Sequence, residues 1–263
     1  MNEFTLIKRY FVTPNVQGAG AGRLPHVALG PGDDCALTHS TPQMVQAISA
    51  DMLVAGRHFF EDTDPQQLGH KALAVNLSDL AAMGATPRSF TLALALPTLD
   101  EPWVAAFSKG LLVLASAHYC ALIGGDITRG PLTIAITVIG EVPPTQALRR
   151  DGAQSGDDLY VSGTLGDAAL ALRWALQDPE TTAVQTSMTA QARQTVESRM
   201  TMPTPRVALG HALRGVATAA MDISDGLAGD LHHLLAASQC GAEVAIDTLP
   251  VSSTVATLPV DLR

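Results

Sequence analysis

The sequence is poor in the residue types on which several common protein classes depend. Its 263 residues include three cysteines, 4% are aromatic and 16% are charged. Cys35, Cys120 and Cys240 form no CxxC pair and no zinc-binding spacing, which excludes a disulfide framework or a zinc ribbon. We expect three small buried side chains in a reducing compartment, and therefore a cytoplasmic protein.

Positive charge is also scarce, with 16 Lys+Arg against 25 Asp+Glu and a formal net charge of −9. Without basic clusters, this balance argues against nucleic acid or an anionic membrane as the partner. No apolar run reaches the ~20 residues of a membrane span, and the first residues lack the apolar core of a secretory signal. The 47% hydrophobic content excludes intrinsic disorder.

Three enzyme motifs are missing: GxxxxGK[ST], GxSxG and HExxH. Their absence excludes a P-loop nucleotide site, a hydrolase nucleophile elbow and a zinc-protease helix. A Gly/Ala run at 18–22 has no strand leading into it, so it predicts a flexible loop.

The order of apolar and polar segments predicts an α/β (α+β) fold with two domains. A polar, turn-rich stretch at 143–157 predicts a boundary between a domain at 1–145 and an α/β domain at 146–263. Asp64 followed by Pro65 begins a helix as N-cap and first residue. The expected strands are 43–51, 120–124, 131–142, 158–163, 217–222 and 243–249. The expected helices are 64–84, 101–118, 166–176, 206–213, 225–238 and part of 178–204.

Aspartate is abundant: the 25 acids are 18 Asp and 7 Glu. Asp51, Asp126 and Asp222 each end an expected apolar strand, where α/β sheets bind ligands. Carboxylates gathered in one crevice repel each other unless a cation binds, and an oxygen-only ligand set favours Mg²⁺ or Mn²⁺ over zinc. One such aspartate alone is better explained as a turn or cap residue, whereas the whole set favours a metal site.

Further acids follow the same logic. Asp34 lies in the glycine turn GPGDDCAL, and Asp225 follows Asp222 by three residues. Asp79 lies in the apolar run ALAVNLSDLAAM, where a charge is costly unless it is paired, for example in a network with Asn76, or binds a metal. Asp230 is predicted to be a surface residue of a helix, so Asp230→Asn is expected to cost little activity.

Mg²⁺ held by carboxylates usually accompanies phosphate oxygens, which indicates a nucleotide. Without a P-loop, additional positive charge would come from Arg129, Arg149 and Arg150, although loop arginines are often simply solvated. His58, in a loop beside two aromatic residues, is a candidate for holding a substrate.

Five runs stand in a characteristic order: GPGDDCAL, SADMLVAGRHF, LGHKALAVNLSDLAAMGATP, LIGGDITRGPLTI and DISDGLAGDL. Together they resemble the bacterial thiamine-monophosphate kinase family, in the aminoimidazole-ribonucleotide-synthetase-like superfamily, over essentially the whole chain. The resemblance implies a homodimer whose N-terminal sheets pair into a barrel, with ATP in a cleft between the two domains. It implies transfer of the γ-phosphate of ATP to thiamine monophosphate, giving thiamine diphosphate, with several Mg²⁺ ions as cofactors.

The resemblance also implies roles for individual residues, and none of them is a covalent catalyst. The implied metal ligands are Asp34, Ser49, Asp51, Asp79, Asp126, Asp222 and Asp225. The implied ATP contacts are Gly125, Asp126, Arg150 and Ser224, and the implied substrate contact is His58. Charge in the transition state would be stabilised by Asp126, Asp222 and Arg150.

The sequence departs from the family pattern in two places. Ala50 stands where family members usually have threonine, which affects one expected metal contact. The family's GGEDYEL-like segment, with its further sheet and helix, does not precede Arg263, so a truncated C-terminal domain is expected. The alternatives are another ATP-dependent enzyme of the superfamily, an inactive ATP-binding fragment, or a metal-dependent phosphatase.

Overall fold

A computed structural model describes residues 3–12 and 24–258; the loop expected at 18–22 lies outside them. The chain divides into two compact units. The first comprises Met1–Ala153 and Pro205–Gln239, and the second comprises Gln154–Thr204 and Cys240–Arg263. A boundary at residue 145 between independently folding domains stays a prediction.

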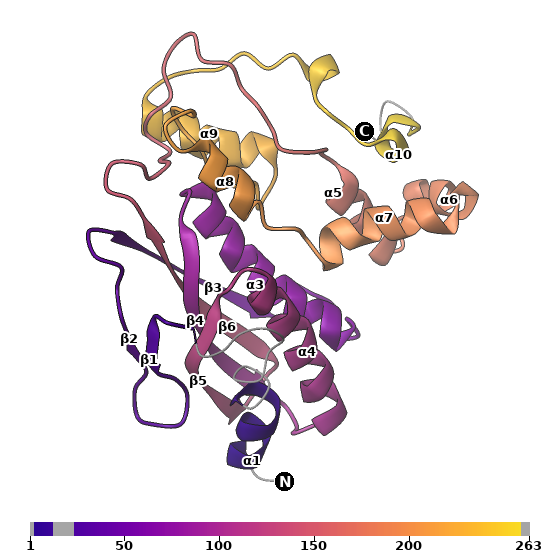
Figure 1. Cartoon of the computed structure of the whole chain (residues 1–263). Coiled ribbons are helices and arrows are strands. Elements are labelled where there is room, and N and C mark those ends of the chain that lie inside the picture. The colour runs from indigo at the N-terminus through magenta and orange to yellow at the C-terminus, as the bar shows by residue number, and fades with distance from the viewer. Residues whose placement is uncertain (1–2, 13–23, 259–263) are drawn as a thin grey trace. The chain divides into compact units, whose positions relative to one another are not determined.

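The first unit is built on a four-stranded mixed sheet with two long helices beside it (Figure 1). Its strands, in spatial order, are β3 (Val45–Val54), β6 (Thr133–Val142), β4 (Thr86–Leu96) and β5 (Ala121–Arg129). The central strand β6 runs antiparallel to β3 and β4, and β5 runs parallel to β4. Two short antiparallel strands, β1 (Val27–Leu29) and β2 (Leu37–Thr38), form a separate ribbon.

The helices α3 (Pro65–Ala82) and α4 (Glu101–Ala117) confirm the two helices expected there. Asp64 caps α3 as its sequence predicts, because its carboxylate accepts the N–H of Gln67 at 2.9 Å. The two helices pack so closely that a Cβ on Gly110 would lie 1.8 Å from the carbonyl oxygen of Gln66. The N-terminal α1 (Glu3–Ile7) and the π-helical turn η1 (Lys8–Val12) add the buried residues Leu6 and Phe11 to this core.

The two faces of the sheet differ in what covers them. On β6, Ile134, Ile136 and Val138 are buried, and a Cβ on Gly140 would touch the side chain of Leu80 in α3. These alternate residues therefore mark the helix-covered face. We call the opposite side the open face. It carries Ile48, Ala50 and Met52 of β3, which lie opposite Ile139, Thr137 and Ala135 of β6.

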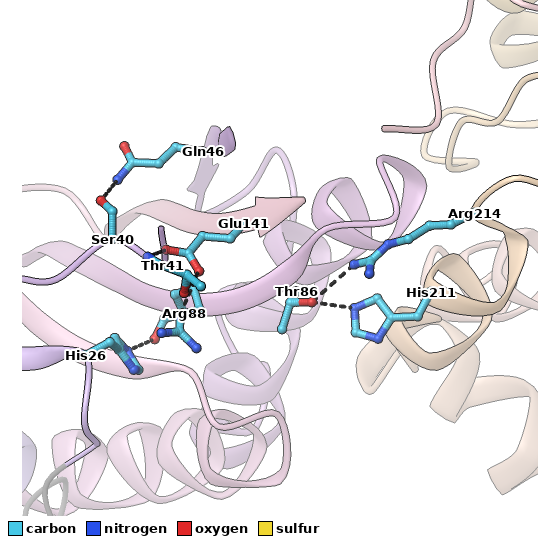
Figure 2. Close-up of polar contacts among 9 residues, drawn as sticks. All are labelled: His26, Ser40, Thr41, Gln46, Thr86, Arg88, Glu141, His211 and Arg214. Carbon is cyan, nitrogen blue, oxygen red and sulfur yellow. Dashed lines mark hydrogen bonds and ion pairs between the residues drawn. The ribbon is translucent and has the colours of Figure 1, made fainter. Parts of the chain in front are cut away.

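Polar contacts connect distant segments of the first unit to this sheet (Figure 2). Glu141, buried near the end of β6, accepts the N–H and hydroxyl of Thr41 at 2.9 and 2.6 Å and forms an ion pair with Arg88. His26 Nε2 lies 2.8 Å from the carbonyl oxygen of Arg88. These contacts hold the segment before β3 against the start of β4.

A second set of contacts attaches α8 (Val207–Leu213) to the start of β4 (Figure 2). His211 Nε2 lies 3.2 Å from the hydroxyl of Thr86, and Arg214 donates to that hydroxyl at 3.1 Å and to the carbonyl of Gly84 at 2.5 Å. The segment from Pro205 to Gln239, which includes α9 (Leu227–Ser238), therefore belongs to the sheet's unit although it follows a stretch of the second unit in sequence.

The described part of the second unit is helical. Its elements are α5 (Asp167–Ala175), α6 (Pro179–Ser187), α7 (Ala190–Thr201), the short 3₁₀ turn η2 (Ile246–Thr248) and α10 (Ser253–Ala256). Its core cluster consists of Leu170, Ala171, Trp174, Val196, Val255 and Leu258. Asp167 is buried and accepts the hydroxyls of Thr164 and Ser252 at 2.8 and 2.5 Å, which joins both ends of this unit.

Three of the expected strands were wrong. Residues 158–163 and 217–222 contain no strand, and 243–249 contains only the turn η2. The physical reason is that a strand needs a neighbouring strand for its main-chain hydrogen bonds. Within the described residues these apolar segments find no such ladder.

Two smaller expectations concern membranes and cysteines. Across residues 3–12 and 24–258, no helix is both long and apolar enough to cross a membrane. Cys120 is buried as expected, but Cys35 is exposed and Cys240 is half-buried, so burial of all three was wrong. Both lie outside helices and strands, where less packing surrounds them.

Candidate functional site

Asp51 and Asp79 face each other across the edge of the sheet and the helix beside it. Asp51 lies inside β3, opposite Ile136, and not at the strand's end as the sequence had suggested, because β3 continues to Val54. Successive side chains of a strand point to opposite faces of the sheet. Ser49 and Asp51 alternate with the open-face residues of β3, so both lie on the helix-covered face. There the hydroxyl of Ser49 donates to Asp79 Oδ2 at 2.5 Å.

Ala50 has the opposite orientation. It pairs with Thr137 on the open face and is exposed. A hydroxyl at position 50 would therefore point away from Asp51 and Asp79. The side chain at this position is not part of their surroundings.

Asp222 completes a group of three carboxylates, which we call the carboxylate cluster: Asp51, Asp79 and Asp222. Burial raises the pKa of Asp51, the charge of Asp222 raises it further, and His58 partly opposes this. Burial also raises the pKa of Asp79, as do Asp222 and Asp51, against the lowering effects of the Ser49 hydrogen bond and of Arg150. The charge of Asp222 thus disfavours the charged forms of Asp51 and Asp79.

The main chain around Arg150 is fixed by the segment that carries Asp222. Ala220 N–H donates to the carbonyl of Arg149 at 3.0 Å, and a Cβ on Gly152 would lie 2.0 Å from Thr218 O. Ser238, in α9, donates its hydroxyl to the carbonyl of Arg150 at 2.6 Å and accepts the N–H of Ala153 at 3.0 Å. These contacts therefore hold together the backbone that carries Arg150 and the segment that leads to Asp222.

The loop after Asp222 shows that the surface position expected for Asp230 was wrong. Asp230 is 4% exposed, and its Oδ2 accepts the N–H groups of Ser224, Asp225 and Gly226 at 2.9, 3.1 and 3.0 Å. Ser224 and Asp225 themselves are exposed. Sequence reasoning missed Asp230 because helical periodicity alone does not show that a loop folds back over that side chain. The only signal was an acid one turn into a helix that begins after a glycine.

His58 lies in the turn after β3, near Asp51. Its Nδ1 accepts the N–H of Val54 at 3.0 Å, so the neutral ring carries its proton on Nε2. His58 is exposed, and this N–H is available to a ligand. Lys71, in α3, donates to the carbonyl of His58 at 3.3 Å, and burial lowers the pKa of its ammonium group. The sequence had not singled out Lys71, whose signal was a cation within the apolar run of α3.

Asp126 and Asp34 lie on other segments of the first unit than the carboxylate cluster. Asp126 lies within β5, which continues to Arg129, so its predicted place at a strand end was wrong. Because β5 and β3 are opposite edges of the sheet, Asp126 and Asp51 are three strand spacings apart, or about 14 Å. Asp34 is exposed in its turn, and its N–H donates to Asp33 Oδ1 at 2.8 Å.

Gly125 has φ +147, and a Cβ there would lie 1.9 Å from Leu92 O, so only glycine fits.

The carboxylate cluster is suited to divalent cations whose coordination is completed by a bound ligand. Among the described residues, no three His, Cys, Asp or Glu side chains are grouped so that they could hold one metal ion by themselves. Mg²⁺ is commonly held by one or two carboxylates together with phosphate oxygens and water. Three mutually repelling acids fit that chemistry, since a cation bound to any of them relieves the repulsion.

Comparison with known proteins first defines the class of fold. The model for the N-terminal domain of AIR synthase related protein matches residues 32–142, and the model for its C-terminal domain matches residues 154–262. The chain therefore has the two-domain α/β fold of AIR synthase related proteins.

Individual relatives narrow this class. The chain is 49% identical over 253 residues to thiamine-monophosphate kinase of Salmonella typhimurium, covering 96% of this chain and 74% of that protein. A crystal structure of thiamine-monophosphate kinase from Stenotrophomonas maltophilia K279a matches with a TM-score of 0.87 at 45% identity, covering 100% of this chain and 80% of that one. AaThiL complexed with AMPPCP and TMP matches with a TM-score of 0.75 at 28% identity, covering 97% of this chain and 76% of that one. The chain belongs to the thiamine-monophosphate kinase family.

Proposed function

We propose that this protein transfers the γ-phosphoryl group of ATP to thiamine monophosphate, giving thiamine diphosphate. The carboxylate cluster, with Arg150 beside it, is the observation that carries this proposal. The cluster can bind cations, and without them its three acids would repel the negative charge of a phosphate-rich ligand. The family supports the choice of substrates, since AaThiL was solved with AMPPCP and TMP.

The proposed cofactor is Mg²⁺, bound as several ions. Asp51, Asp79 and Asp222 would hold it, and Ser49 would orient Asp79 through their hydrogen bond. Bound Mg²⁺ would neutralise phosphate charge and so reduce the repulsion between the two substrates. By family resemblance the proposed ligands also include Asp34, Asp126 and Asp225.

The residues of this chain act by positioning and by charge. The acceptor is a phosphate oxygen that is already ionised at neutral pH, so the reaction needs no strong general base and no covalent intermediate. Arg150 adds a fixed cation near Asp79, suited to a phosphate. Gly125 and Ser224 are further proposed contacts to ATP, and His58 can donate its Nε2–H to thiamine monophosphate.

A homodimer is proposed as well, with two sheets pairing into a barrel through the open face. Ile48 and Met52 are 62% and 57% exposed there, and their neighbours are mainly alanine and threonine. An exposed apolar patch of this kind is costly in water and typical of an interface. Three unpaired cysteines support a reducing, cytoplasmic location.

Product formation tests the proposed reaction directly. The purified chain is incubated with ATP, Mg²⁺ and thiamine monophosphate, and the thiamine phosphates are separated by chromatography and detected by fluorescence after oxidation. Thiamine diphosphate should appear only when ATP and Mg²⁺ are both present. No product, together with binding of AMPPCP and Mg²⁺, would instead define an ATP-binding module.

A thermal-shift comparison separates the kinase from other ATP-dependent enzymes of the class. Thiamine monophosphate should stabilise the chain loaded with Mg²⁺ and AMPPCP, whereas a purine ribonucleotide should not. The opposite pattern would overturn the substrate. Phosphate release from thiamine monophosphate without ATP would show a phosphatase.

A further inference from the structure

One carboxylate outside the carboxylate cluster organises the loop that carries Asp222. Asp230 Oδ2 is the acceptor for three consecutive main-chain N–H groups, those of Ser224, Asp225 and Gly226. All three distances lie between 2.9 and 3.1 Å. A single atom therefore determines the direction of three successive peptide groups.

Because Asp230 is buried, its carboxylate depends on these three hydrogen bonds. The side chain is 4% exposed, and a buried carboxylate is costly unless donors satisfy it. The three amides supply those donors, and charge-assisted bonds of this kind are stronger than neutral ones. If the loop opened, the charge of Asp230 would lose these donors, so the loop and the side chain hold each other in place.

The same contacts decide how the loop can meet a ligand. Because their N–H groups are directed at Asp230, these amides are not available to cradle a phosphate, as the amides at a helix start often do. The exposed side chains of the loop are those of Ile223, Ser224 and Asp225. Asp222, two residues before the first of these amides, acts on Asp51 and Asp79.

We propose that Asp230 is a positioning residue, which shapes the loop at 222–226 so that Asp222, Ser224 and Asp225 reach the metal ions and the nucleotide. This inference rests on the proposed function, because it takes those three residues as ligands. Asp230 itself touches neither substrate. Its effect on the reaction passes through the loop.

The experiment compares Asp230→Ala and Asp230→Asn with the parent chain. His233→Ala, a substitution at an exposed position of the same helix, is the matched control. Hydrogen–deuterium exchange of peptides covering 222–230 reports the loop directly. Calorimetric titration with AMPPCP at a series of Mg²⁺ concentrations reports ligand binding. Activity is measured over the same Mg²⁺ series.

Asp230→Ala should speed exchange at 224–226 and weaken Mg²⁺-dependent AMPPCP binding by about 10- to 100-fold, the range found when partners of metal ligands are removed. Its activity should recover as Mg²⁺ is raised, which a general loss of folding would not allow. Asp230→Asn keeps an acceptor oxygen without the charge, so it should fall between Asp230→Ala and the parent, and it tests the proposal if the alanine variant does not fold. His233→Ala should match the parent.

Two results would overturn the proposal. Unchanged exchange at 224–226 in the variants would show that Asp230 does not hold the loop. Faster exchange with unchanged Mg²⁺ and AMPPCP binding would show that the loop's shape does not matter to the ligands. If the parent chain makes no thiamine diphosphate, the proposed reaction fails, whereas exchange and AMPPCP binding still decide the role of Asp230.

Discussion

The two units of the chain use their buried residues differently. In the first, a four-stranded sheet and two long helices share a continuous core that includes Phe90 and Phe107. In the second, one small cluster around Trp174 is buried among short helices. The candidate site lies in the first unit, where strand register and helix packing fix the relative positions of distant residues. A site of repelling carboxylates needs such support, because it opposes the folded state electrostatically.

The largest expected effect distinguishes an aspartate of the site from one outside it. Asp222→Asn removes a charge from the carboxylate cluster and should lower thiamine diphosphate formation roughly 10²-fold or more, as for other groups that stabilise charge in a transition state. Asp247→Asn, an exposed position in the second unit, should leave the rate unchanged. Steady-state rates at saturating Mg²⁺ make the comparison, and equal losses would contradict the assignment of the site.

Truncation of a core side chain in the second unit tests whether that unit unfolds independently of the first. Trp174→Ala should destabilise the second unit by about 3–5 kcal/mol, because little else can fill the space that it leaves. Hydrogen exchange should then rise in α5 and α7 while the peptides of α3 and α4 stay protected. Leu172→Ala, on the same helix but 44% exposed, is the control. Loss of protection in both units at once would show that they unfold together.

Glycine substitutions compare the two units in the opposite direction, because the larger loss of stability is expected in the first unit. Gly110→Ala places a methyl group 1.8 Å from Gln66 O at the crossing of α3 and α4, so we expect a loss of about 1–3 kcal/mol in the free energy of unfolding. Gly241→Ala in the second unit meets nothing within 4 Å and should change it by less than about 0.5 kcal/mol. Urea denaturation measures both, and similar values would contradict the close helix crossing.

The smallest expected effect is a stabilisation. Folding raises the pKa of Asp51 above its ordinary value of 3.8, so the folded state binds more protons than the unfolded state in the window just above that value. Stability therefore falls as the pH rises through the folded pKa. Asp51→Asn should melt at a slightly higher temperature than the parent at pH 7 without Mg²⁺.

That gain should shrink as the pH falls through the raised pKa of Asp51 and disappear below about pH 3.8, where the carboxyl is neutral in both the folded and the unfolded state. It should reverse when Mg²⁺ and AMPPCP are added. Asp62→Asn, at an exposed position, serves as the control and should melt like the parent. A lower melting temperature for Asp51→Asn at pH 7 would contradict the repulsion within the carboxylate cluster.

Local signals predicted the helices of the first unit well. Asp64 and Pro65 begin α3 as expected, because a cap and a fixed φ are properties of two adjacent residues. Apolar runs predicted strands less well. Residues 133–142 form β6, but 217–222 do not form a strand, because the same composition needs a partner that sequence proximity does not provide.

The sequence by itself determined the helix starts, the acidic residue set and the resemblance to a kinase family, since these depend on residue identity and short spacing. Only the tertiary structure decided which acids meet. Register between β3 and β6 places Asp51 toward Asp79 and Ala50 away from it, strand order separates Asp126 from Asp51, and a loop folding back buries Asp230. These outcomes depend on pairing between segments far apart in the chain, and no local pattern encodes the register of that pairing.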